Sequence, residues 1–165
     1  MFKDTDKMKL TCLPADPMAG GCDPQTLFPG GTFDRIQTQI FNQNCAVSGC
    51  HDSQSHQNGL ILETGASVTN LINVDPTNAS AKGAGWKRVV QFPCGPDPNC
   101  VPTMGDSTTS YLYHKVTGDL PDDSYGLRMP RKRAKLNSTL IDIIKIWIDN
   151  GAPSPPHDRW LDGTF

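Results

Sequence analysis

The stretch that decides the fold is the seven-residue segment Cys45-Ala46-Val47-Ser48-Gly49-Cys50-His51. It separates two thiols by four residues and puts an imidazole directly after the second thiol. Gly49 gives this spacer backbone freedom, because glycine adopts conformations that a side chain disfavours. One interpretation is a structural disulfide beside an unrelated histidine. A zinc site is another, although adjacent Cys50 and His51 are awkward ligands for one tetrahedral ion and no second pair has tetrahedral spacing.

A third interpretation is covalent attachment of haem. Two thiols can add to the two vinyl groups of haem, and the residue that follows then offers its imidazole to the iron. The usual spacing has two residues between the cysteines, and four is a longer version of the same pattern. The stretch therefore predicts one haem c per chain, bonded to Cys45 and Cys50, with His51 as the proximal iron ligand.

The composition agrees with a domain that needs a cofactor to complete its core. The chain has 165 residues, which suggests one domain. Only 36% of them are apolar, and 15 glycines and 14 prolines indicate many loops. The net charge of −2 gives no reason to expect nucleic-acid binding. No apolar run reaches the roughly 18 residues of a transmembrane helix.

The rest of the chain predicts a mainly α domain with long irregular loops. Thr32 can cap a helix that carries Phe33, Ile36 and Ile40 on one face and leads into the motif. Shorter helices are expected at 66–72 and 107–116, whereas 77–106 and 119–136 look irregular. The clearest helix runs from an Asn137 cap to Gly151. Its apolar residues cover nearly every face, so it should be buried; they are Leu140, Ile141, Ile143, Ile144, Ile146, Trp147 and Ile148.

This order of elements resembles the class I cytochrome c family, and more narrowly its bacterial monohaem domains with the longer cysteine spacing. The resemblance covers residues 32–153 in pieces. The matching segments are Asn44 to His51, Gly59-Leu60, Ser110 to Tyr113, Arg128-Met129-Pro130 and Ile144 to Pro153. Residues 91–106 look like an insertion. Residues 1–31 have no counterpart and are expected to form a loop-rich arm, and 154–165 a tail.

The resemblance implies a methionine in the loop before the last helix as the distal ligand, here Met129. A thioether is a soft ligand that favours ferrous iron and raises the reduction potential. Pro130 restricts the residue before it to extended conformations, which suits such a loop. The alternative is that Met129 only packs against the core. Rival ligands are His114 and Met104, whereas His56 is too close to the motif and His157 lies in the tail.

Leu60, Leu62, Leu140, Ile144 and Trp147 are candidates to line a haem pocket, with plain core packing as the alternative. A buried indole N–H would also need a hydrogen-bond partner. The four other cysteines allow three pairings, and proximity favours the disulfides Cys12–Cys22 and Cys94–Cys100. Each would stabilise a loop by about 2–3 kcal/mol.

A basic segment, defined as Arg128, Arg131, Lys132, Arg133 and Lys135, adjoins the proposed distal ligand. It could dock an acidic redox partner or be an ordinary solvated loop. Iron with a protein ligand on each side predicts an electron carrier, free or as a subunit of a larger redox complex, rather than an enzyme. Alternatives are peroxidase-like catalysis or gas sensing at an open iron site, and a haem-free, disulfide-rich secreted binding module.

Haem attachment and disulfides both indicate a periplasmic or otherwise exported protein. The first seven residues, Met1-Phe2-Lys3-Asp4-Thr5-Asp6-Lys7, lack the apolar core of a signal peptide. We therefore expect the leader to be missing from this chain.

Overall fold

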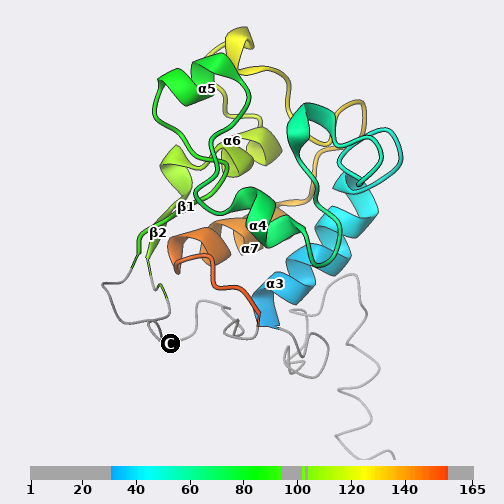
Figure 1. Cartoon of the computed structure of the whole chain (residues 1–165), viewed down its shortest axis with the longest axis vertical. Coiled ribbons are helices and arrows are strands. Elements are labelled where there is room, and N and C mark those ends of the chain that lie inside the picture. The colour runs from blue at the N-terminus through cyan, green and yellow to red at the C-terminus, as the bar shows by residue number, and fades with distance from the viewer. Residues whose placement is uncertain (1–30, 94–101, 103, 156–165) are drawn as a thin grey trace, which may run out of the picture.

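The computed structural model describes residues 31–93, 102 and 104–155. This part is a largely helical domain with one two-stranded antiparallel sheet (Figure 1). The helices are α3 (Gly31–Ile36), the π-helix η1 (Gln37–Cys45), α4 (Ser67–Leu71), α5 (Ala79–Gly83), α6 (Tyr111–Thr117) and α7 (Ser138–Asp149). The 3-10 turns are η2 (Gln57–Gly59), η3 (Ser107–Thr109) and η4 (Asp123–Tyr125), and the strands are β1 (Val90–Gln91) and β2 (Gly105–Asp106).

The first helix delivers the chain directly to Cys45, as the sequence predicts. α3 continues without a break into η1, and Phe33, Ile36 and Ile40 are all buried. Thr32 does not cap this helix, because α3 begins one residue earlier and buries Thr32. The π-helical hydrogen bonding of η1 lasts to Cys45 itself, and π-helical turns in other proteins often occur at functional sites.

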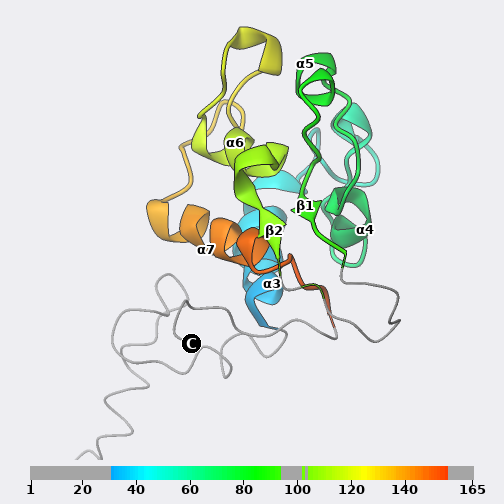
Figure 2. The same cartoon turned by 90° about the vertical axis from the view of Figure 1, so that its left-hand side faces the viewer.

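The last helix, α7, is the centre of the core. The Asn137 side chain accepts a hydrogen bond of 2.9 Å from the Leu140 N–H, which confirms the predicted cap. Trp147 is fully buried, packs on Phe33 with 5.0 Å between ring centroids, and donates its indole N–H to the Pro153 carbonyl at 2.9 Å. This contact joins α3 to α7, which lie against each other in both views (Figures 1 and 2).

The region expected to be irregular, 77–106, contains regular elements. Asn78 accepts a hydrogen bond from the Ala81 N–H and caps α5. Val90 pairs with Asp106 across the antiparallel strands β1 and β2, which bring together the ends of the supposed insertion at 91–106. Most of that insertion, including Cys94 and Cys100, lies outside the described residues, as do Cys12, Cys22 and all but the end of the proposed arm.

The helix expected over 107–116 is interrupted at Ser110. The Asp106 side chain accepts from the Thr108 N–H and so caps the 3-10 turn η3. Ser110 then adopts an extended conformation, and its hydroxyl accepts a hydrogen bond of 2.8 Å from the Val90 N–H. The side chain of Ser110 thus joins the hairpin to the start of α6. Among the described residues, no helix is long and apolar enough to cross a membrane.

Candidate cofactor site

The motif forms a closed turn at the end of η1. The Ala46 N–H donates to the Phe41 carbonyl at 2.7 Å, and the His51 N–H donates to the Cys45 carbonyl at 3.0 Å. Gly49 has a φ of +82°, a left-handed conformation that favours glycine. This conformation agrees with the prediction that the four-residue spacer uses the backbone freedom of Gly49.

The two motif thiols are not joined to each other. Cys45 is buried and Cys50 is half-buried, and both are free cysteines. Burial raises the pKa of the Cys45 thiol to about 12; nearby Cys50 adds to the rise, and Arg133 opposes it. Cys45 therefore stays protonated at neutral pH. Among the described residues, no three histidine, cysteine, aspartate or glutamate side chains gather as a metal-ion site.

A cavity of about 430 Å³ lies beside the motif, within the roughly 300–1,000 Å³ of sites for cofactors and small ligands. Cys45 and His51 of the motif line it, together with Met129 from a distant part of the chain. Much of the remaining wall is apolar: Leu60, Leu62, Leu71, Leu112, Val116 and Leu127. Cys50 does not line the cavity.

The imidazole of His51 is kept neutral, and one of its ring nitrogens has no hydrogen-bond partner within the protein. Burial lowers its pKa, and the charges of Arg88 and Lys115 lower it further, whereas nearby carbonyls of Leu60 and Gln57 partly oppose this. Its Nδ1 atom is buried without a hydrogen-bond partner. Buried polar atoms rarely remain unpartnered, and a neutral imidazole is the form that binds a metal.

Met129 is held at the cavity by the end of α6. The last carbonyls of a helix have no partner within the helix. At the end of α6, the Lys115 carbonyl accepts a hydrogen bond of 2.7 Å from the Met129 N–H. Gly118, the C-cap in a left-handed conformation, lets the chain leave the helix at that point. The predicted loop therefore brings its methionine to the same cavity as His51.

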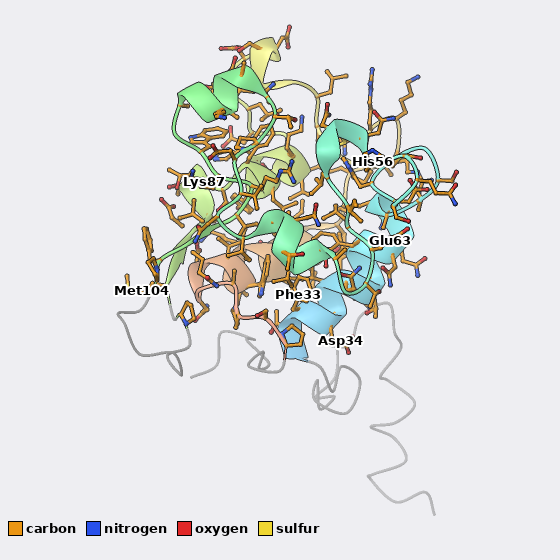
Figure 3. All side chains as sticks on the ribbon, in the orientation of Figure 1. Phe33, Asp34, His56, Glu63, Lys87 and Met104 are labelled. Atoms are coloured by element: carbon orange, nitrogen blue, oxygen red, sulfur yellow. The ribbon has the colours of Figure 1, made fainter. Side chains whose placement is uncertain are left out.

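The rival ligands lie elsewhere. Met104 is 63% exposed beside the hairpin, at the edge of the molecule (Figure 3). His114 stacks on Trp86, and its two ring nitrogens lie 2.6 and 2.7 Å from the Asp119 and Thr108 carbonyls. His56 is exposed on the loop after the motif (Figure 3). None of the three lines the cavity, and His157 is outside the described residues.

The expected pocket residues divide into two groups. Leu60 and Leu62 line the cavity. Leu140, Ile144 and Trp147 do not, because α7 directs them into the protein core. Sequence reasoning missed Leu71 from α4 and Leu112 and Val116 from α6. Their apolar character was visible, but nothing local distinguishes a cavity wall from any other buried helix face.

The basic segment is not one uniform surface. Arg131, Lys132 and Lys135 are all exposed, and of these three only Arg131 also lines the cavity. Arg128 donates to the Met129 and Arg133 carbonyls at 3.3 and 2.9 Å. Arg133 donates to the Gln43 carbonyl at 3.3 Å, so these two arginines tie the segment to itself and to η1.

The cavity fits a covalently held haem in the chemistry of its donors. The Cys45 thiol, the neutral His51 imidazole and the Met129 thioether line it, much of the wall between them is apolar, and the second thiol, Cys50, lies in the same motif outside the lining. The chain matches no protein-family model, no curated protein and no solved structure in the comparisons. Proposals about function therefore depend on this geometry and on the motif.

Proposed function

We propose that the protein transfers single electrons through one c-type haem attached to Cys45 and Cys50. His51 would be the proximal ligand and Met129 the distal ligand. The supporting observation is that Cys45 and His51 of the motif line one cavity together with Met129, which is far from them in sequence. When bound, the haem supplies a one-electron couple whose potential depends on its axial ligands.

The protein's own residues account for three requirements of such a carrier. Burial keeps the Cys45 thiol and the His51 imidazole neutral. The leucine and valine side chains of the wall would cover part of the cofactor, and apolar surroundings help to set a reduction potential. The Lys115 carbonyl fixes the Met129 backbone, so the thioether is presented by a defined loop.

An optical spectrum of protein made in a host with haem-attachment machinery tests this proposal. Covalent haem should remain with the polypeptide after denaturation and organic extraction. The ferric protein should show the weak long-wavelength band of methionine ligation. A colourless product would instead support a haem-free binding module, and extractable haem would remove covalent attachment.

A pair of methionine variants tests the distal ligand. Met129→Ala should lose the long-wavelength band and bind carbon monoxide in the ferrous state within seconds, because the thioether no longer occupies the iron. Met104→Ala, which removes an exposed methionine, should behave like the wild type. Fast carbon monoxide binding by the wild type would favour the open-site alternative, catalysis or gas sensing.

A further inference from the structure

The cavity wall carries positive charge without a matching negative charge. Arg88, Lys115 and Arg131 line it, and no aspartate or glutamate among the described residues does. The described residues form their ion pairs elsewhere, at Asp75 and Asp149. Arg88 is buried, Lys115 is half-buried and Arg131 is exposed. A buried cation is costly unless it is paired, so a bound anion would stabilise the two inner cations.

Arg88 is the deepest of these cations. It is only 8% exposed, and its guanidinium donates to the Asn70, Gly59 and Asn58 carbonyls at 3.0, 3.3 and 3.3 Å. These acceptors are neutral, so they satisfy its N–H groups but leave its charge unbalanced. Burial accordingly lowers the pKa of Arg88.

Lys115 is a half-buried cation with few partners. Its ammonium makes one long hydrogen bond, 3.4 Å to the Tyr125 carbonyl, and lies 5.3 Å from the centre of the Tyr111 ring. The absence of a side chain at Gly126 makes room for it, since a Cβ there would lie 3.1 Å from Nζ. Burial and the charge of Arg131 lower the pKa of Lys115. Of its three N–H donors, at least two have no acceptor among the described residues.

We propose that Arg88, Lys115 and Arg131 bind the carboxylates of the tetrapyrrole, with Lys115 as a positioning residue that also raises the reduction potential. This inference depends on the proposed function. A haem carries two propionate groups, so it would bring the two negative charges that the wall lacks. A cation beside the cofactor disfavours the more positive, oxidised state and so raises the potential.

Three variants of the holoprotein test the inference by redox titration at pH 7. Lys115→Gln removes the charge but keeps the backbone carbonyl that holds Met129. At a fixed ambient potential, this variant should have an oxidised-to-reduced ratio about tenfold higher than the wild type, which equals a fall in midpoint potential of about 59 mV for one electron. Lys115→Arg should stay within about twofold of the wild type. Lys82→Gln is the control, because its side chain is 63% exposed and does not line the cavity.

The ferric long-wavelength band must be unchanged in each variant, so that a lost methionine ligand is not mistaken for a charge effect. A Lys115→Gln shift no larger than that of Lys82→Gln would overturn the inference, and so would an equal shift in Lys115→Arg. If Lys115→Gln does not fold, Arg131→Gln takes its place; because Arg131 is exposed, its fall in midpoint should be smaller but still larger than that of Lys82→Gln. Wild-type protein without covalent haem would overturn the proposed function as well, whereas haem-loaded protein with no shift would overturn this inference alone.

Discussion

Replacing Gly105 with alanine should destabilise the domain, because β2 passes very close to the end of α7. A Cβ at this position would lie 2.1 Å from the Ile148 carbonyl oxygen and 2.6 Å from the Val90 carbonyl oxygen. Both obstacles are backbone atoms, which cannot rotate away as a side chain can. The strand and the helix must therefore separate, or the hairpin must open.

The size of the effect follows from these distances. To reach 3.0 Å, the limit for real Cβ contacts, the strand must move about 0.9 Å from the Ile148 carbonyl. Overpacking of this kind costs about 1–3 kcal/mol. The same movement stretches the 3.0 Å hydrogen bond from the Ser107 N–H to the Asp149 carboxylate, worth about 1 kcal/mol. We expect a loss of about 3 kcal/mol, or a fall in Tm of about 6–12 °C for a chain of this size.

Thermal unfolding followed by circular dichroism, with urea midpoints, measures this loss. Gly83→Ala is the matched control, because its Cβ would have no neighbour within 4 Å and Gly83 ends α5. Alanine there should stabilise the protein by up to about 1 kcal/mol. Equal Tm values for the two variants, or a Gly105→Ala loss below about 1 kcal/mol, would refute the close packing of β2 on α7.

Two further predictions concern the site and its surface. In haem-free protein at pH 8, iodoacetamide should alkylate Cys50 of a Cys45→Ser variant at least tenfold faster than Cys45 of a Cys50→Ser variant. The reason is that the pKa of Cys45 is about 12 and only a thiolate reacts. Mass spectrometry measures both rates, and equal rates would contradict the buried state of Cys45. Neutralising the exposed Lys132 and Lys135 together should slow reduction by an acidic redox partner several-fold at low salt and flatten the salt dependence of that rate. The midpoint potential should stay unchanged. Stopped-flow rates that match the wild type would indicate that the basic segment is only a solvated loop.

The features that the sequence predicts well are those with local causes. Asn137 caps α7 because its side chain reaches an N–H three residues later, and the pattern of such a cap before an apolar run is visible in the sequence. Gly49 likewise meets a requirement of its own turn. Met129 was predicted through the family resemblance, and its place at the cavity agrees with that prediction without testing the haem.

The features that the sequence could not predict depend on contacts between distant segments. Trp147 and Leu71 are both buried apolar residues of helices, yet only Leu71 lines the cavity. Trp147 does not line the cavity because it packs against Phe33 of α3 instead. The hairpin was missed because β1 and β2 have two residues each, too few to give an alternating pattern.

Lys115 shows why the charge of the site also had to come from the structure. In sequence it is one lysine near the end of a short helix, where a cation is favourable for reasons unrelated to any ligand. In the fold, its carbonyl holds the Met129 backbone, while its ammonium lies in the cavity wall. One residue thereby connects the proposed iron ligand to the proposed carboxylate site. Because a substitution removes the ammonium but keeps the carbonyl, the two roles can be separated by experiment. A changed reduction potential with intact methionine ligation would be caused by the loss of the Lys115 charge.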